Sequence, residues 1–158
     1  MKRRRRQIGI LALAALIGGG ALLYGLSRTP PEAVAMTVYM TPECGCCGDW
    51  VAHMKRSGFM VTSRYIPEAD LWGLKDYHEI PHSTRSCHTA EVRGYVVEGH
   101  IPADAVRRIL RDLPDIRGAA VPGMPLGSPG MEVPGQPPHL YDVVAIHRDG
   151  EISVLERR

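Results

Sequence analysis

The first part of the chain has one long apolar stretch behind a basic start. Residues 2–6 are all Lys or Arg, and residues 8–26 carry no charge and are rich in Leu, Ala and Gly. Such a pattern is typical of an export signal, and an uncharged stretch of this length can also anchor a protein in the inner membrane. We therefore expect residues 1–35 to be a signal peptide or a membrane anchor, with the basic end in the cytoplasm and the rest exported to the periplasm.

Beyond residue 35, short apolar runs alternate with helical patterns. Runs of β-prone residues predict strands at 37–40 and 59–66. Residues 91–97 are predicted to be a strand or extended chain. Helices are predicted by apolar periodicity and by stop signals, at 49–56, 69–77 and 102–113. Residues 118–138 contain too much Gly and Pro for regular structure, and 141–155 predicts a closing β-hairpin with a turn at 148–150.

This order of elements predicts an α/β fold with a mixed sheet and helices packed on it. A strand that leads into a cysteine motif at the start of a helix is how thioredoxin-like folds present their active site. We expect residues 36–158 to form a single thioredoxin-like, metal-binding domain after the signal or anchor segment.

The charge of that domain excludes one class of partner. Residues 36–158 hold 13 Lys and Arg against 16 Asp and Glu, because six of the basic residues lie in the first 35. Without a basic surface, the domain lacks the electrostatic attraction that nucleic-acid binding requires. We expect no nucleic-acid partner, and contact with a membrane only through the N-terminal segment.

The chemistry is concentrated in Cys44-Gly45-Cys46-Cys47. Cys44 and Cys47 share a face on the first turn of a helix, so they can form a disulfide or chelate one ion, and Cys46 adds a third sulfur. The positive end of the helix dipole favours thiolate, and hence both metal binding and exchange. Three interpretations remain open: a metal site, a thiol-disulfide oxidoreductase in which Cys44 attacks and Cys47 resolves, and a structural disulfide with one leftover thiol.

Other soft donors favour copper among the metals. Met124 and Met131 lie in the Gly- and Pro-rich segment, where a methionine has little core to fill, and His88 adjoins Cys87. Cu(I) prefers thiolate and thioether ligands. Zinc fits less well, because Cys87-His88 is not a spaced chelating pair. His100 is expected to position a turn.

These residues resemble those of the CopG-like periplasmic proteins of copper-resistance operons, once grouped as a domain of unknown function. The resemblance spans 38–155 and rests on four blocks in the same order, at 44–47, 86–90, 94–103 and 121–132. It implies a thioredoxin-like fold and a copper centre made by Cys44, Cys46, Cys47 and Cys87, and it leaves redox activity open. It also suggests that the loop 121–125 faces the cysteine motif, with Pro125 as the candidate for a cis peptide bond.

The sequence thus predicts a periplasmic copper-binding protein that acts in copper resistance and homeostasis. The expected metal ligands are the four cysteines with Met124, Met131 and His88, and the expected partners are copper ions and other periplasmic copper-handling proteins. A thiol-disulfide oxidoreductase that uses the Cys44/Cys47 pair is the alternative.

Overall fold

The structure is a computed structural model, and it describes residues 33–158. The predicted signal or anchor therefore lies almost wholly outside the described residues. The first strand begins at Val34, just before the predicted start of the domain. Within residues 33–158, no helix has the length and apolarity needed to cross a bilayer.

Seven strands form one mixed sheet in the order β2-β1-β3-β4-β5-β6-β7. Their bounds are β1 Val34–Met40, β2 Phe59–Tyr65, β3 His88–Val92, β4 Tyr95–Glu98, β5 Gly118–Ala120, β6 Asp142–Ile146 and β7 Ile152–Arg157. The β1–β2 and β4–β5 pairs are parallel, and the other neighbours are antiparallel.

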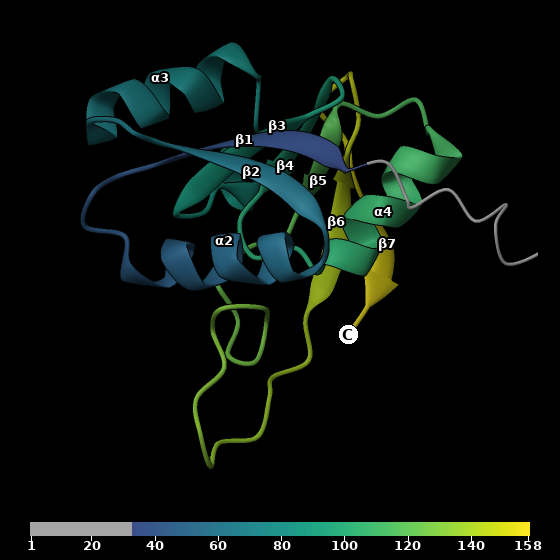
Figure 1. Ribbon diagram of the computed structural model, residues 1–158. Helices are drawn as coiled ribbons and strands as arrows, with labels where there is room; N and C mark the ends of the chain where they lie inside the picture. The colour runs from purple at the N-terminus through teal and green to yellow at the C-terminus, as the bar shows by residue number, and fades with distance from the viewer. Residues whose placement is uncertain (1–32) are drawn as a thin grey trace, which may run out of the picture. The chain divides into compact units, whose positions relative to one another are not determined.

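Three α-helices cover this sheet: α2 Gly45–Arg56, α3 Glu68–Tyr77 and α4 Ala103–Asp112. A short 3-10 helix, η1, spans His82–Thr84. Figure 1 shows α3 on one side of the sheet and α2 on the other. The sequence β1-α2-β2-α3-β3-β4-α4, with the sheet order β2-β1-β3-β4, is the thioredoxin arrangement, which confirms the predicted fold class. The strands β5, β6 and β7 extend it.

Helix α2 is held by its apolar face and by two side-chain hydrogen bonds to the start of α4. Cys47, Trp50, Val51 and Met54 form the buried face of α2, at the spacing expected of an amphipathic helix. The Trp50 indole Nε1 donates to the Ile101 carbonyl at 2.9 Å, and His53 Nε2 accepts from the Ala103 N–H at 3.1 Å. These bonds fix the start of α4 against α2.

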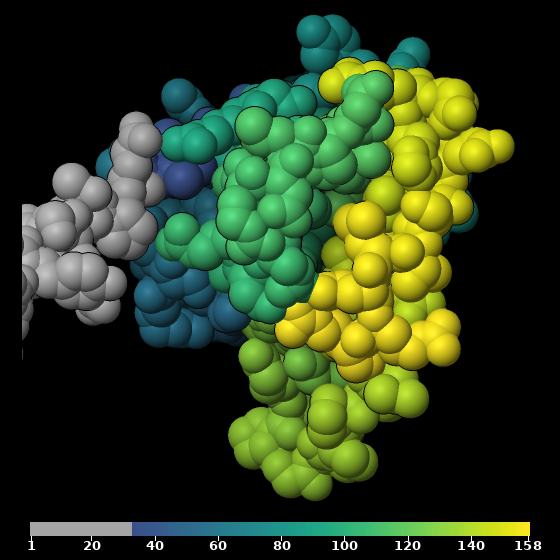
Figure 2. Space-filling view, turned by 90° about the vertical axis from the view of Figure 1, so that its right-hand side faces the viewer, coloured from purple at the N-terminus to yellow at the C-terminus, as the bar shows by residue number. Residues whose placement is uncertain are grey.

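The long loop between β5 and β6 folds back against α2. Figure 2 shows this Gly- and Pro-rich segment protruding from one end of the domain. A Cβ atom at Gly130 would lie 2.7 Å from the Trp50 backbone N, so the loop backbone packs directly on the helix there. Gly130 has φ +84, which a side chain would also strain.

Two elements and one peptide bond differ from the sequence-based expectations. Residues 91–97 are not one extended segment, because Arg93 (φ 46) and Gly94 (φ 82) make a two-residue turn between β3 and β4. The three-residue strand β5 lies inside a segment expected to be irregular, since its burial comes from its neighbours β4 and β6 rather than from its own sequence. All peptide bonds within residues 33–158 are trans, so the expectation of a cis bond at Pro125 was wrong.

Gly118 provides a test of the sheet extension. A Cβ at this position would lie 2.0 Å from the Val96 carbonyl O across the β4–β5 pair. We expect Gly118→Ala to lower the free energy of unfolding by about 1–3 kcal/mol, as overpacking does. Chemical denaturation measures this change.

Gly73 offers a matched control, because a Cβ there meets nothing within 4 Å in the middle of α3. Gly73→Ala should stabilise the domain by up to about 1 kcal/mol. Equal effects of the two substitutions would contradict the close approach of β5 to β4.

Candidate metal and thiol site

The cysteine motif lies at the N-terminus of α2, directly after β1. Cys44 is the N-cap residue, and its N–H donates to the Thr41 carbonyl at 3.2 Å. Cys44 and Cys47 are joined by a disulfide, while Cys46 is a free thiol. The Cys47 side chain is fully buried, and Cys44 is partly exposed. The predicted pairing of positions 44 and 47 on one helix face is confirmed.

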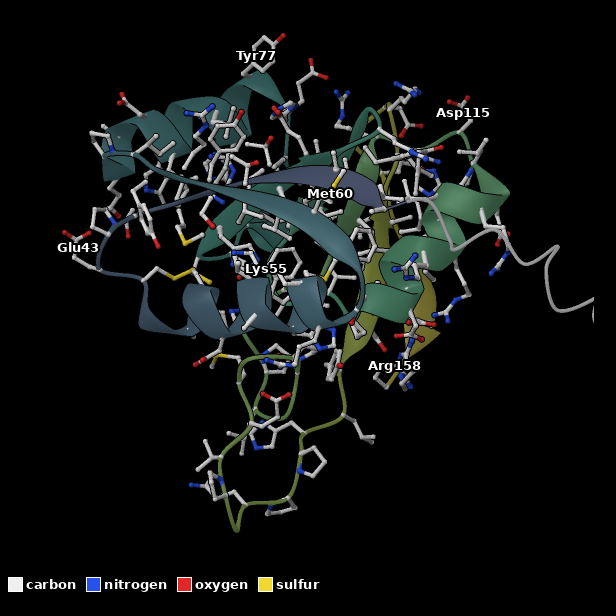
Figure 3. All side chains as sticks on the ribbon, in the orientation of Figure 1. Glu43, Lys55, Met60, Tyr77, Asp115 and Arg158 are labelled. Atoms are coloured by element: carbon white, nitrogen blue, oxygen red, sulfur yellow. A yellow bond between two sulfur atoms is a disulfide. The ribbon has the colours of Figure 1, made fainter. Side chains whose placement is uncertain are left out.

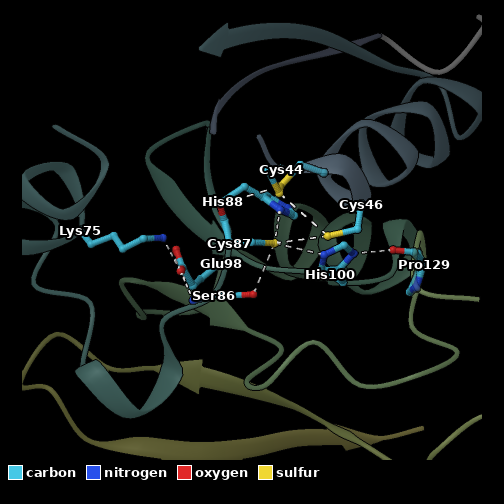
Figure 4. The surroundings of a disulfide bond; sticks show 10 residues. Cys44, Cys46, Lys75, Ser86, Cys87, His88, Glu98, His100 and Pro129 are labelled. Carbon is cyan, nitrogen blue, oxygen red and sulfur yellow. Dashed lines mark hydrogen bonds and ion pairs between the residues drawn. A yellow bond between two sulfur atoms is a disulfide. The ribbon is translucent and has the colours of Figure 1, made fainter. Parts of the chain in front are cut away.

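Cys87 comes from a distant part of the chain and completes the cluster. It immediately precedes β3, whose first residue His88 pairs with Met40 at the end of β1. As Figure 4 shows, Cys46 Sγ lies between two other sulfurs, 3.9 Å from Cys44 Sγ and 4.0 Å from Cys87 Sγ. All four sulfur atoms lie within 4.8 Å of one another. The structure therefore brings together the four predicted cysteines.

Two histidines contact Cys87 from the interior of the domain. The Cys87 Sγ lies 3.4 Å from His88 Nδ1 and 3.3 Å from His100 Nε2. His100 Nδ1 is 2.8 Å from the Pro129 carbonyl, to which it donates, so its Nε2 presents a lone pair to the sulfur. His88 is fully buried beside Trp50, with ring centroids 4.4 Å apart. Burial lowers the pKa of both imidazoles, which keeps them neutral and able to ligate.

Sequence reasoning included His88 but missed the contact of His100, which it assigned to a turn. The missed signal was the block Gly99-His100-Ile101-Pro102 beside the end of a strand. Because β3 and β4 form a hairpin, the residues just before β3 and just after β4 meet at the same end of the sheet.

The surroundings of Cys87 disfavour its charged form. Burial, with a smaller contribution from the neighbouring Cys46, raises the pKa of the Cys87 thiol to about 12. A bound metal ion supplies the opposite effect, because coordination replaces the thiol proton. Cys87 is therefore inert as a free nucleophile at neutral pH but available as a metal ligand.

A buried ion pair holds the segment that carries Cys87. The Glu98 carboxylate accepts hydrogen bonds from Lys75 Nζ at 2.6 Å, from Thr89 Oγ1 at 2.7 Å and from the Ser86 backbone N–H at 2.6 Å. Both Lys75 and Glu98 are almost fully buried. Burial raises the pKa of Glu98, and the ammonium of Lys75 opposes that effect. This network links α3 and β4 to the residue next to Cys87.

A pocket of about 550 Å³ opens over Cys44, Cys46 and Cys87. Its lining combines the thiols with acidic, aromatic and thioether side chains: Thr41, Glu43, Cys44, Gly45, Cys46, Glu68, Leu71, Trp72, Lys75, Ser86, Cys87 and Met124. Figure 3 shows Glu43 beside the beginning of α2. Since Lys75 is paired with Glu98, the acidic side chains Glu43 and Glu68 favour entry of a cation.

The two predicted loop methionines occupy different places. Met124 lines the pocket, is 40% exposed and has φ 47, a conformation that costs energy for a residue other than glycine. Met131 is not part of the pocket lining, and its backbone closes the loop through bonds to Ser128 and Gly127. The segment facing the cysteine motif most directly is Ser86-Cys87, and the 121–125 loop joins it through Met124.

The number of sulfur donors in this cluster depends on whether the Cys44–Cys47 disulfide is closed, as it is in this structure. Reduction of the Cys44–Cys47 disulfide would add two thiols to those of Cys46 and Cys87, and Met124 lines the adjoining pocket; thiolate and thioether donors suit a soft ion such as Cu(I). With the disulfide formed, two of the sulfurs are withdrawn from ligation. The residues thus fit copper, and oxidation changes how many donors they offer.

The buried ion pair can be tested by charge removal. We expect Glu98→Gln to lower the free energy of unfolding by about 3–5 kcal/mol, because it leaves the Lys75 ammonium buried without a countercharge. Lys75→Met should lower the free energy of unfolding by a similar amount, because it leaves the Glu98 carboxylate buried without a countercharge. Denaturation curves of both variants measure these losses.

The double variant Lys75→Met/Glu98→Gln is the control for this pair. It removes both charges together, so we expect it to be more stable than the sum of the single changes predicts. Strictly additive losses would show that the two side chains do not interact.

Comparisons with known proteins show which family this chain resembles. A family profile described as "Protein of unknown function, DUF411" matches residues 84–131. Two solved structures, both described as copper resistance protein CopG, are also similar. Form 2 is 44% identical with a TM-score of 0.73 and covers 80% of this chain and 99% of its own. Form 1 is 43% identical with a TM-score of 0.74 and covers 80% and 98%.

No curated protein gives a significant match to the chain. The two structural matches nevertheless extend over nearly the whole of the similar chains at high identity. The profile match includes Cys87, His88, His100 and both loop methionines. The chain belongs to the CopG-like copper resistance protein family.

Proposed function

We propose that this chain is a periplasmic copper-binding protein of copper resistance, which binds Cu(I) through Cys44, Cys46, Cys47 and Cys87. The observation that carries the proposal is the convergence of four cysteine sulfurs within 4.8 Å at a pocket. Thiolates at this spacing can bridge or chelate a soft ion, and the N-terminus of α2 helps to stabilise their charge.

The remaining lining of the pocket supports copper over zinc. Met124 adds a thioether, which is a donor for Cu(I) and not for zinc. The similar solved proteins are described as copper resistance proteins. Copper is the ion that the protein handles, so it is cargo or substrate rather than a fixed part of the fold.

The proposed location rests on the N-terminal sequence and on the disulfide. A basic start followed by an uncharged apolar stretch supports export, either with cleavage or as an inner-membrane anchor. The Cys44–Cys47 disulfide is a bond that persists in oxidising compartments such as the periplasm. Copper-handling proteins of that compartment are the proposed partners.

Oxidation of the Cys44/Cys47 pair would control copper occupancy. In the disulfide form only Cys46 and Cys87 remain as thiols, so the four-sulfur site is dismantled. Reduction restores two thiolates and with them the affinity for Cu(I). The protein would therefore bind copper when its cysteines are reduced and release it when they are oxidised.

A second candidate function is thiol-disulfide exchange. The observation that favours it is the asymmetry of the disulfide at the start of α2, with Cys44 partly exposed and Cys47 fully buried. An exchange partner would attack Cys44 and release Cys47 as the leaving thiolate. Such a reaction does not require Cys46 or Cys87.

An anaerobic Cu(I) titration tests the proposed function. The reduced protein, in competition with a chelator of known affinity, should bind at least one Cu(I) per chain, and the protein with its disulfide closed should bind far more weakly. We expect Cys46→Ser/Cys87→Ser to weaken Cu(I) binding by about 100-fold or more, because it removes half of the thiolates.

The same double variant separates the two candidate functions. A copper protein loses its metal in this variant, whereas an exchanger keeps its turnover with a disulfide substrate. Weak Cu(I) binding by the reduced wild-type protein, together with rapid exchange that survives the substitutions, would replace the copper proposal by the oxidoreductase.

Met124 should contribute to the affinity for Cu(I). Met124→Leu keeps the size and apolar character of the side chain but removes the sulfur, so we expect a weakening of about tenfold in the chelator competition. Met131→Leu is the matched control, because Met131 lies outside the pocket lining. Equal affinities of the two variants would exclude Met124 as a ligand.

A further inference from the structure

We infer that Cys87, His88 and His100 form a second metal site, which binds one divalent ion of borderline softness, such as zinc or cobalt, while the Cys44–Cys47 disulfide is closed. The three donor atoms Cys87 Sγ, His88 Nδ1 and His100 Nε2 lie within 4.8 Å of one another. The site shares only Cys87 with the proposed Cu(I) cluster.

The spacing of these donors matches that of a metal site. Metal–sulfur bonds of about 2.3 Å and metal–nitrogen bonds of about 2.0–2.1 Å, at tetrahedral to trigonal angles, place sulfur and nitrogen about 3.5–3.8 Å apart. The observed separations from Cys87 Sγ are 3.4 Å to His88 Nδ1 and 3.3 Å to His100 Nε2. These two separations lie within a few tenths of an ångström of those in a metal site, and the donor atoms of the two histidines lie within 4.8 Å of each other.

His100 is oriented as a ligand. Its Nδ1–H donates to the Pro129 carbonyl at 2.8 Å, which fixes the tautomer and aims the Nε2 lone pair at Cys87. A metal-binding histidine commonly donates its other N–H to a backbone carbonyl or carboxylate in this way. The long loop thus supplies the outer contact that holds the ligand in place.

His88 is difficult to explain without such a role. It is fully buried, and its Nε2 has no hydrogen-bond partner within the described part of the chain. A buried polar atom without a partner is costly, and an apolar ring of similar size would avoid that cost. The Nδ1 atom of this imidazole lies 3.4 Å from Cys87 Sγ, and a ligand role at Nδ1 accounts for a histidine at this position.

The two nitrogens and one sulfur define the class of ion. Imidazole and thiolate together suit borderline divalent ions, whereas four thiolates suit Cu(I). Binding replaces the Cys87 thiol proton, which leaves to solvent as the metal–sulfur bond forms. Because neither Cys44 nor Cys47 is a donor, closing their disulfide leaves this site complete.

Cobalt(II) titration of the oxidised protein tests the inference. The protein is kept anaerobic without reductant, so that the disulfide stays closed and Cys46 and Cys87 stay free. We expect one Co(II) per chain, with a thiolate-to-cobalt charge-transfer band and displacement by Zn(II). His100→Gln should lower the affinity by about tenfold or more.

Serine substitutions at the two free thiols form the matched pair. Cys46→Ser should retain the cobalt band, and Cys87→Ser should abolish it, although both remove one partly exposed thiol. The unfolding midpoint and the intact disulfide report whether each variant is folded. If His100→Gln does not fold, the comparison of Cys46→Ser with Cys87→Ser still tests whether Cys87 is a ligand of the second metal site.

Two results would overturn the inference: no Co(II) bound by the oxidised wild-type protein, or equal loss of the band in both serine variants. The second would indicate a site made by the thiol pair. The Cu(I) titration of the reduced protein is independent, so Cu(I) binding without Co(II) binding removes only this inference. Co(II) binding by the oxidised protein without Cu(I) binding by the reduced protein would overturn only the Cu(I) proposal.

Discussion

The antiparallel pairing of β1 with β3 is the constraint on which the site depends. It places His88 opposite Met40, so the residue before β3 meets the turn that leads from β1 into α2. The free thiol of Cys87 then lies 4.0 Å from Cys46, although the two residues are 41 positions apart. A shift of this pairing by one residue would send the side chains of β3 to the opposite face of the sheet and separate the thiols.

The polar interior around Cys87 shows how this register is maintained near the site. Glu98 joins Lys75 of α3, Thr89 of β3 and the Ser86 N–H, so three elements converge on the residue that precedes Cys87. A buried ion pair is a poor source of stability compared with apolar packing. The ion pair instead constrains the geometry. The Glu98 carboxylate has all its hydrogen-bond partners only when α3, β3 and β4 take their observed positions.

The local parts of this structure were predictable from the sequence, and the parts that depend on distant neighbours were not. The cysteine motif at a strand-to-helix junction, the helix after Pro102 and the closing hairpin follow from patterns within a few residues. The strand β5 and the contact of His100 with Cys87 do not, because both arise from pairing across the sheet. From the sequence, Lys75 would likewise be expected on the surface of a short helix. Its burial is explained by its pairing with the Glu98 carboxylate, which the sequence does not indicate.

One sulfur, that of Cys87, is common to the proposed Cu(I) donor set and to the inferred Cys87, His88 and His100 donor set. When Cys44 and Cys47 are reduced, Cys87 is one of four thiolates that converge beneath the pocket, and a soft ion has the most favourable ligands there. When the disulfide closes, the two imidazoles behind Cys87 and the free thiol of Cys46 are the donors that remain around it among the described residues. The state of one bond at the start of α2 would then decide which class of ion the same cysteine holds. The buried histidines give the oxidised domain a ligand set that the cysteine motif alone does not provide.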